Sequence, residues 1–243
     1  MNNLDVTGRI HSFESFGAVD GPGIRFIIFT QGCNLKCKYC QNRDTWDVST
    51  GETYTVKQLL DKIENYKEYM QVSGGGVTVS GGEPLLQPDF LIALFTELHK
   101  AGISTCIDTA GIIPLTDRIK QVIELTDIFL LDIKSINDNT CTWLTGFSNK
   151  LELEFAKYLS DNNKRIWIRH VLVPGITDKD EDLLNLRDFI SNLQIEKVEF
   201  LPYHTLGKFK WEKLGLKYEL DNIRPANTRD VAHAKKMVIG DIS

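Results

Sequence analysis

Short runs of apolar residues alternate along the chain with longer stretches in which apolar residues recur at helical spacing. The first run, residues 24–30, is rich in β-branched and aromatic side chains and predicts a strand. Residues 56–70 have the apolar spacing of an amphipathic helix. The same patterns predict further strands at 76–80, 103–108, 127–134, 165–173 and 197–201, and further helices at 88–101, 114–125, 148–162, 180–192 and 227–238.

The alternation of strand and helix persists through six units with short connections and no change in composition. It predicts one α/β domain with a parallel sheet. Right-handed crossovers permit either a doubly wound sheet or a partial barrel, and the pattern does not choose between them. Residues 8–23 end in the turn-rich Asp20-Gly21-Pro22-Gly23 and are interpreted as a lead-in to the first strand.

Polar groups follow the carboxyl ends of the predicted strands. In chain order they are a cysteine-rich loop, Gly82-Glu83, Asp108-Thr109, the pair Asp132 and Lys134, Arg169, and Pro202-Tyr203-His204. In parallel α/β barrels the active site is built from these carboxyl ends. We therefore expect the six groups to converge on one mouth.

Each group also has a structural interpretation. Gly81-Gly82-Glu83 can be only a turn between strand and helix, and it matches neither glycine-rich nucleotide motif. Asp132 and Lys134 face the same side of a strand and can form an ion pair inside a barrel. His204 can be capped by the backbone. Arg169 can pair with Asp132, meet substrate or close the barrel, and the sequence does not rank these roles.

Three of the five cysteines, Cys33, Cys37 and Cys40, are spaced C-x3-C-x2-C. Three thiolates within eight residues can converge on one metal centre, but a ferredoxin-type cluster or a structural zinc site uses four ligands. A three-cysteine cluster would leave one iron open to an outside ligand, as at a catalytic site. Zinc is the alternative if a histidine is the fourth ligand, and disulfides fit poorly because the count is odd.

The two remaining cysteines are distant from this loop and from each other. Cys106 lies within a predicted strand and is expected to pack as a small apolar side chain. Cys141 lies in a polar connection, and the sequence indicates no role for it.

Composition narrows the class of protein. The 243 residues are a normal length for one α/β barrel, and the formal charge of −5 argues against broad binding to a nucleic-acid backbone. The N-terminus shows no basic-then-apolar leader, and no apolar run approaches the ~20 residues of a membrane span. We expect a cytoplasmic, reduced protein. A monomer is expected because no long apolar edge or heptad pattern stands out.

The C-x3-C-x2-C motif, with the aromatic Tyr39 before its last cysteine, resembles the signature of the radical S-adenosylmethionine (SAM) enzymes. Further stretches are similar to one subgroup, the glycyl-radical-enzyme activating enzymes: residues 8–25, 41–47, 73–83, 107–111, 131–134, 167–175 and 201–211. The resemblance implies a partial (β/α)6 TIM-like barrel at about 24–204 within a single domain 1–243, with a lead-in at 1–23 and a C-terminal loop and helix at 205–243.

The resemblance also implies a cofactor and a set of site residues. Cys33, Cys37 and Cys40 would hold a [4Fe–4S] cluster whose fourth iron is chelated by SAM. The residues implied in SAM binding are Tyr39, Cys40, Gln41, Gly82, Glu83, Asp132, Lys134 and His204. Asp108, Thr109 and Asp132 are candidates for a monovalent cation site. The catalytic candidates are Asp20 and Arg169. For Asp20 the alternative is that its loop is only a turn. Gln41 stands where a histidine is common in the family.

The implied activity is the reductive cleavage of SAM to methionine and a 5′-deoxyadenosyl radical, which takes hydrogen from a backbone glycine of a partner enzyme. The partner implied is pyruvate formate-lyase, because the stretch between Cys40 and Gly81 has no cysteine and so cannot house the second cluster of many other activases. Flavodoxin or ferredoxin is the implied electron donor. The alternatives are an activase of another glycyl radical enzyme, a radical SAM enzyme with a small-molecule substrate, and a non-catalytic iron–sulfur electron carrier.

Overall fold

The computed structural model describes residues 2–240, which fold as two compact units. The described residues of the first unit are 2–34, 45–109 and 113–130, and those of the second are 35–44, 110–112 and 131–240. The chain therefore passes from one unit to the other several times. The boundary at residue 130 falls inside one strand, β6 (Ile128–Asp132).

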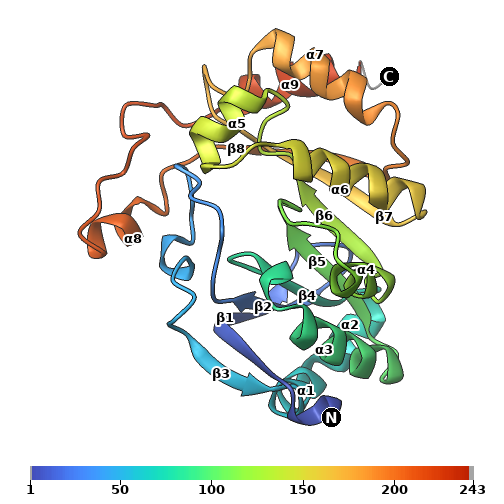
Figure 1. Cartoon of the computed structure of the whole chain (residues 1–243). Coiled ribbons are helices and arrows are strands. Elements are labelled where there is room, and N and C mark those ends of the chain that lie inside the picture. Colours follow the sequence, from blue (N-terminus) through green and yellow to red (C-terminus); the bar gives the residue numbers. More distant parts are fainter. Residues whose placement is uncertain (1, 241–243) are drawn as a thin grey trace. The chain divides into compact units, whose positions relative to one another are not determined.

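The first unit is built on a sheet with the strand order β3-β1-β2-β4-β5, followed by the beginning of β6 (Figure 1). Its parallel strands are β2 (Arg25–Thr30), β4 (Gly76–Gly81) and β5 (Ser104–Thr109). Each of them ends at the position where the sequence predicts a polar group. The predicted strands at 24–30, 76–80 and 103–108 are confirmed to within a residue.

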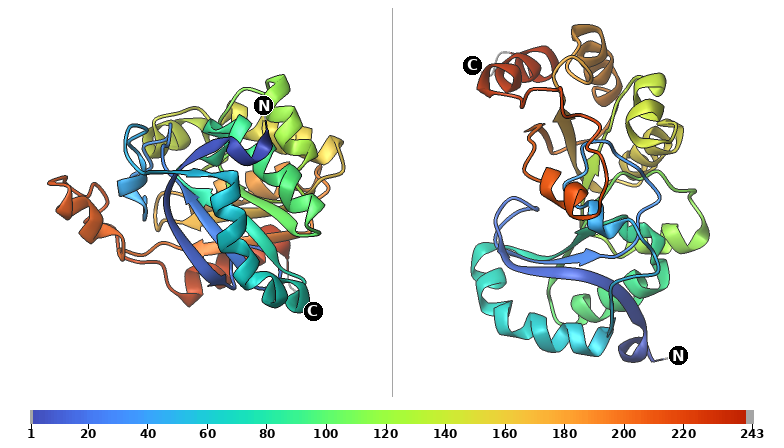
Figure 2. Two further views of the ribbon diagram at one scale, coloured as in Figure 1. Left: turned by 90° about the horizontal axis from the view of Figure 1, so that it is seen from below. Right: turned by 90° about the vertical axis from the view of Figure 1, so that its left-hand side faces the viewer.

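Two antiparallel strands extend this sheet beyond the predicted ones. β1 (Thr7–Gly17) pairs with β2 on one side and with β3 (Glu52–Thr55) on the other, and it is the long dark-blue strand in Figure 2. The lead-in expected at 8–23 is therefore largely a strand, which corrects that interpretation. Register shifts between Ile10 and Ser12 and between Glu14 and Gly17 interrupt the two-residue alternation by which a strand is recognised.

Helices of the first unit cover this sheet. They are α1 (Val56–Ile63), α2 (Lys67–Ser73), α3 (Pro88–Lys100) and α4 (Asp117–Glu124), with short 3-10 turns at Asn3–Asp5, Glu64–Tyr66 and Pro84–Leu86. α1 begins at a capping box in which Thr55 and Gln58 exchange hydrogen bonds. The single helix predicted at 56–70 is divided into α1 and α2 by the 3-10 turn at Glu64–Tyr66. α3 buries Leu91, Leu94 and Leu98 completely, so it supplies much of the core.

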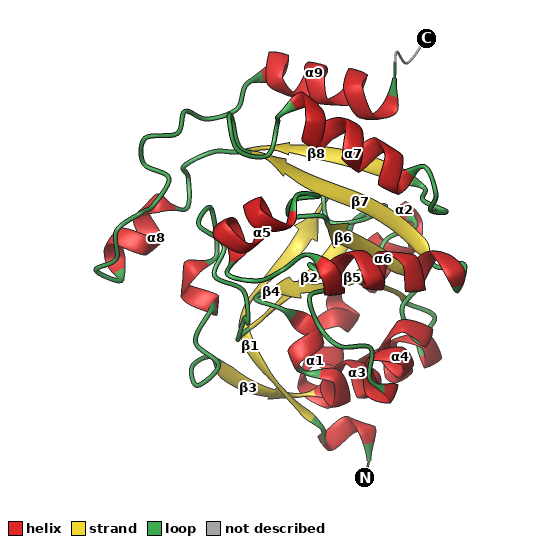
Figure 3. Ribbon diagram, turned by 45° about the horizontal axis from the view of Figure 1, so that its top comes forward, coloured by secondary structure: helices red, strands yellow, loops and turns green. Residues whose placement is uncertain are grey.

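The second unit contains the end of β6 and the parallel strands β7 (Arg165–Leu172) and β8 (Lys197–Pro202). Its helices are α5 (Asp138–Thr145), α6 (Lys150–Asp161), α7 (Asp180–Ile190), α8 (Lys208–Lys213) and α9 (Thr228–Ile239). α7 and α9 pack against each other, as Figure 3 shows. α5 and α8 were not predicted, because each is too short to show a clear helical period. No helix within residues 2–240 is both long enough and apolar enough to cross a membrane.

Candidate functional site

The segment that carries Cys33, Cys37 and Cys40, here called the cysteine segment, begins where β2 ends. Gly32 has a φ of 102°, which favours glycine, and its N–H donates to the Thr45 carbonyl oxygen at 2.7 Å. The N–H of Cys33 donates to the Trp46 carbonyl oxygen at 3.4 Å. The buried strand and the returning backbone at residues 45–46 together fix the start of the cysteine segment.

The turn after β4 packs directly on the start of the cysteine segment. The N–H of Gly82 donates to the Thr30 carbonyl oxygen at 3.0 Å, and that of Glu83 donates to the Gly32 carbonyl oxygen at 2.8 Å. A Cβ atom at Gly82 would lie far inside van der Waals contact with that Gly32 oxygen. The glycine therefore allows a backbone approach that no other residue permits.

Hydroxyl groups orient the two carboxylates at this edge of the first unit. The buried Glu83 accepts hydrogen bonds from the Leu85 N–H at 3.1 Å and from the Thr109 hydroxyl at 2.7 Å. Asp108 accepts from the Ser80 hydroxyl at 2.7 Å. Because charge-assisted hydrogen bonds are strong, these bonds hold both carboxylates in fixed positions. The first unit thus brings together Glu83 and Thr109 from the predicted set, and it also carries Cys33, Gly82 and Asp108.

In the second unit, main-chain hydrogen bonds attach the rest of the cysteine segment to α5. Lys36 donates from its N–H to the Thr145 carbonyl oxygen at 2.8 Å, and Lys38 donates to that of Leu144 at 2.9 Å. The Cys40 N–H donates to the Cys37 carbonyl oxygen at 3.0 Å, which closes a turn between these two cysteines. Cys37 is buried and Cys40 is half-buried.

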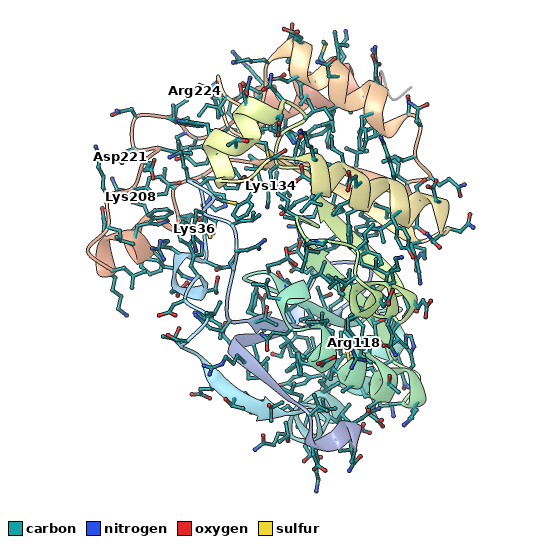
Figure 4. The ribbon with its side chains drawn as sticks, viewed as in Figure 1. Lys36, Arg118, Lys134, Lys208, Asp221 and Arg224 are labelled. Atoms are coloured by element: carbon teal, nitrogen blue, oxygen red, sulfur yellow. The ribbon has the colours of Figure 1, made fainter. Side chains whose placement is uncertain are left out.

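The buried Tyr39 and the half-buried Asp132 and Lys134 form a cluster in the second unit, with Lys134 labelled in Figure 4. The ammonium of Lys134 forms an ion pair with Asp132 and lies 5.9 Å from the centre of the Tyr39 ring. Burial by itself would lower the pKa of Lys134, but the Asp132 carboxylate and the other nearby groups raise that pKa well above its usual value. Burial raises the pKa of the Tyr39 phenol. Lys134 is therefore charged and Tyr39 neutral at neutral pH.

Glu152 contacts the predicted site at Lys134 and was not predicted from the sequence. It is fully buried in α6, and its Oε1 accepts the Lys134 main-chain N–H at 2.8 Å. Burial raises the pKa of this carboxyl group well above its usual value. A signal was present in the sequence, because Glu152 shares the buried helical spacing of Phe155, Ala156 and Leu159. A carboxylate on the apolar face of a helix is unusual enough to mark a site.

Gln41 joins the cysteine segment to the chain that follows β8. Its Nε2 donates to the Tyr39 and His204 carbonyl oxygens, each at 3.0 Å, and its Oε1 accepts the Gly207 N–H at 2.6 Å. The Trp211 indole N–H donates to the Cys40 carbonyl oxygen at 3.0 Å. These contacts place Gln41 and the backbone of His204 beside the cysteines, and they show Trp211 to be a second residue that the sequence analysis missed.

For the two catalytic candidates, Asp20 and Arg169, the structure shows contacts of their main-chain carbonyl oxygens. Asp20 is half-buried, and its carbonyl oxygen accepts the Thr78 hydroxyl at 2.6 Å, which ties the turn to β4. Arg169 stands in register with Glu199 across β7 and β8, and its carbonyl oxygen accepts the Ile133 N–H at 2.9 Å. Neither observation tests a catalytic role, so both roles stay predictions.

The two remaining cysteines lie in the core. Cys106 is fully buried in β5, as expected. Cys141 is fully buried in α5 rather than in a polar connection, and its sulfur lies 3.8 Å from the Thr145 hydroxyl. Burial raises the pKa of the Cys141 thiol to about 12. The Cys141 thiol is therefore a poor metal ligand.

The residues present fit an iron–sulfur cluster and a polar ligand. All five cysteines are free of disulfides, and thiolates are the ligands that such clusters use. The Tyr39 hydroxyl and the Asp132 Oδ1 are buried without a hydrogen-bond partner among residues 2–240, and buried polar atoms of this kind ordinarily have one. Within the same residues, no three His, Cys, Asp or Glu side chains form a ready-made ion site. The predicted cation site at Asp108, Thr109 and Asp132 stays a prediction.

Comparison with known proteins identifies relatives along nearly the whole chain. Residues 27–187 match the profile of the radical SAM superfamily. Over 234 residues the chain is 47% identical to the pyruvate formate-lyase 1-activating enzyme of Escherichia coli K12, covering 96% of this chain and 95% of that protein. Over 240 residues it is 50% identical to the pyruvate formate-lyase-activating enzyme of Staphylococcus epidermidis, covering 96% of each.

Solved structures agree on the fold. A radical SAM methyltransferase from Sphaerobacter thermophilus gives a TM-score of 0.64 at 14% identity over 88% of this chain and 63% of that one. A domain of a pyruvate-formate lyase-activating enzyme from Bacteroides vulgatus gives 0.58 at 23% identity over 68% of this chain and 94% of that one. Together with the parallel strands, these likenesses confirm the predicted α/β fold of the radical SAM enzymes.

Proposed function

Because the chain belongs to the radical SAM superfamily and, within it, to the family of pyruvate formate-lyase-activating enzymes, we propose that it generates a glycyl radical on pyruvate formate-lyase. The observation that carries this proposal is the 47% identity to such an enzyme over 96% of the chain. When bound, the [4Fe–4S] cluster and SAM supply a 5′-deoxyadenosyl radical, by reductive cleavage of SAM to methionine, that takes a hydrogen atom from a backbone glycine of the partner.

The chain's own residues bind and orient these groups. Cys33, Cys37 and Cys40 are the ligands proposed for three irons of the cluster, which leaves the fourth open to SAM. Gly82 lets the turn after β4 pack directly on the backbone of Gly32, next to Cys33, and so supports the proposed binding residue Glu83. The Glu83 carboxylate is suited to accept hydrogen bonds from the amino group of SAM, because it is buried and fixed by Thr109.

Lys134 and its neighbours serve the anionic and polar parts of SAM. The charged ammonium of Lys134 is suited to a carboxylate, and the second oxygen of Asp132 has no partner within residues 2–240 and is suited to a ribose hydroxyl. Tyr39, Cys40, Gln41 and His204 complete the proposed binding residues. Asp108, Thr109 and Asp132 remain proposed for a monovalent cation.

The substrate is a peptide segment of another protein. Asp20 is proposed to close over that segment, because its turn contains two glycines with positive φ, Gly21 and Gly23, that give the loop its tight path. Arg169 is proposed to contact substrate. The electron donor is proposed to be flavodoxin or ferredoxin, and the activase is proposed to act as a cytoplasmic monomer.

The proposal is tested anaerobically. The cluster is reconstituted and reduced, SAM and pyruvate formate-lyase are added, and an electron paramagnetic resonance spectrum is recorded. We expect a glycyl radical doublet that is absent in Cys37→Ala and present in the control Cys106→Ala, since Cys106 lies in the core of β5.

Two other outcomes would support the alternatives. Production of 5′-deoxyadenosine without the doublet would keep the radical chemistry and assign another substrate, whether a different glycyl radical enzyme or a small molecule. A well-formed cluster with neither signal would indicate a non-catalytic electron carrier.

A further inference from the structure

Positive charge gathers in two separate stretches of this otherwise acidic chain. The whole sequence has 28 Lys and Arg against 33 Asp and Glu. Residues 205–217 contain Lys208, Lys210, Lys213 and Lys217 with a single carboxylate, Glu212. Residues 36–43, which include two of the cysteines, contain Lys36, Lys38 and Arg43 with no acidic residue.

The fold brings these two stretches together within the second unit. The Lys210 ammonium lies 3.1 Å from Asn42 Oδ1 and 3.1 Å from Asp44 Oδ1. The Arg43 guanidinium lies 5.4 Å from the centre of the Trp211 ring, and the Trp211 indole N–H donates to the Cys40 carbonyl oxygen. α8 is therefore in direct contact with the cysteine segment.

Apolar side chains are exposed in the same place. Leu206 is 75% exposed and Phe209 is 60% exposed, whereas Trp211 on the same short helix is buried. Large apolar groups exposed beside charged ones are characteristic of protein interfaces, which have an apolar centre and a polar rim. We call the residues Lys36, Leu206, Phe209, Lys213 and Lys217 the lysine surface.

Part of the positive charge is compensated and part is not. Lys208 forms an ion pair with Asp221, and Lys38 forms one with Glu219. Figure 4 shows Lys208 beside Asp221, with Lys36 on the same side of the second unit. Lys213 and Lys217 are exposed and form no ion pair with any residue in the range 2–240. These two lysines therefore present their charge to an outside partner.

We infer that the lysine surface docks an acidic protein that delivers one electron to the cluster. The inference rests on the proposed function, because it assumes that Cys37 and Cys40 hold a cluster that must be reduced. In this step the partner's reduced flavin or iron–sulfur group loses one electron and the oxidised cluster gains it. No bond forms or breaks at the surface. The direct contact of Trp211 with Cys40 places the docked partner next to the cluster ligands.

Charge complementarity selects this occupant. Opposite charges steer an encounter and raise association rates by about 10 to 10³, which suits a partner that must bind briefly and leave. Complexes that transfer electrons have small interfaces, below about 1,200 Å², so a short element such as the six-residue α8 can form the centre of one. An acidic donor protein matches the lysines, and a flavin or cluster near its surface matches the exposed apolar centre.

The test compares a protein donor with a small reductant. The holoenzyme with the double substitution Lys213→Glu and Lys217→Glu is reduced either by an acidic flavodoxin or by dithionite, and initial 5′-deoxyadenosine formation is measured at several salt concentrations. With flavodoxin at low salt, we expect the rate to fall about tenfold or more and its salt dependence to weaken. With dithionite, the rate should be unchanged.

Two further variants make the result specific. Lys57→Glu with Lys235→Glu changes the net charge equally on exposed positions of α1 and α9, and it should leave both rates unchanged. Phe209→Ser should lower the rate with flavodoxin while keeping the salt dependence of the parent protein. Iron content and circular dichroism verify that each variant is folded and loaded.

Three outcomes would overturn the inference. An equal loss with dithionite would mean that the lysines support the cluster and not a partner. An unchanged rate with flavodoxin would exclude docking of the donor here, and a loss of the glycyl radical when pyruvate formate-lyase is then added would assign the surface to the substrate enzyme. An equal loss of rate in the Lys57→Glu, Lys235→Glu control would mean that the net charge of the protein, and not the lysine surface, determines the rate. If the parent protein cleaves no SAM with either reductant, the proposed function fails first, and this result is distinct from the other three.

Discussion

At the scale of single residues, the site depends on atoms that are absent as much as on atoms that are present. Gly82 matters because it has no side chain, since its neighbour Gly32 occupies the space where a Cβ would lie. Glu152 matters because a carboxyl group is buried where an apolar residue would normally pack. Each feature yields a prediction.

Gly82→Ala should displace the turn after β4 from the cysteine segment. The added Cβ overlaps a backbone oxygen that cannot move without moving Cys33 as well. We expect SAM affinity, measured by calorimetry on the reconstituted protein, to fall at least about tenfold, the equivalent of ~1.4 kcal/mol. Gly102→Ala is the control for a glycine substitution without overlap, because an added Cβ at Gly102 would meet nothing within 4 Å, even though its positive φ of 69° makes alanine less favourable there. Similar SAM affinities for the two variants would contradict the packing argument.

Glu152→Gln should raise stability above neutral pH. Because burial raises the pKa of Glu152, the protonated form favours the folded state. That stability is fully present below the unfolded pKa, near ~4.3, and is lost as the pH rises through the folded value. Glutamine keeps an acceptor for the Lys134 N–H and does not ionise. The Tm of the variant should exceed that of the parent at pH 8 and match it near pH 4.5.

Glu152→Leu separates the hydrogen bond from the charge. Leucine cannot accept the Lys134 N–H, and an unsatisfied buried donor costs about 1–3 kcal/mol. We expect this variant to be less stable than the glutamine variant at every pH in a urea titration. Equal stability of the two would show that the hydrogen bond contributes nothing.

At the scale of elements, short-range patterns predicted those helices and strands that are long and regular. α3, α7 and α9 were expected within two residues of their ends because their apolar spacing is sustained. β1 was missed because its bulges interrupt the alternation of side chains along the strand. α8 was missed because six residues are too few to show a helical period. Motifs led to the proposed cysteine ligands and to Gly82-Glu83, whereas the contacts of Gln41 and Trp211 join segments more than 160 residues apart and could not be predicted.

The start of α9 is an element whose stability should depend on pH. Asp230 closes a capping box with Asn227 and pairs with Arg224. The hydrogen bond from Arg224 lowers the pKa of Asp230 to about 2. Its stabilisation is present above the unfolded pKa, near ~3.9, and is lost as the pH falls through the folded value. Asp230→Asn should therefore lower the Tm at pH 7, with the difference disappearing near pH 2. A difference that persists there would exclude this ion pair as the cause.

At the scale of the whole molecule, the described residues form two compact units whose segments alternate along the chain. The sequence offered no sign of this division, because no linker, repeat or change in composition marks residues 34, 44 or 130. The prediction of a single domain over 1–243 rested on that uniformity. Each unit has buried apolar residues of its own, such as Leu94 in the first and Phe155 in the second.

Removal of the cluster should therefore have local consequences. We expect amide hydrogen exchange to increase in residues 33–44 and 205–217 when the cluster is stripped with a chelator, because Gln41 and Trp211 connect these two stretches. The helices α1, α3 and α9 should keep their protection. A loss of protection throughout the chain would show that the cluster is required for the fold.

The main-chain hydrogen bonds between the cysteine segment and α5 have a consequence for the history of the sequence. Lys36 and Lys38 use their amide groups, and Leu144 and Thr145 use their carbonyl oxygens, so these bonds do not depend on the side chains at positions 36 and 38. Drift can change the side chains at positions 36 and 38, whereas Leu144 and Thr145 are fully buried and cannot take a charge without cost. Proline at 36 or 38 is forbidden because it lacks the amide hydrogen. A lineage that acquires a new electron donor can therefore change the exposed side chains of this segment by single substitutions. The proposed cysteine ligands would not be disturbed.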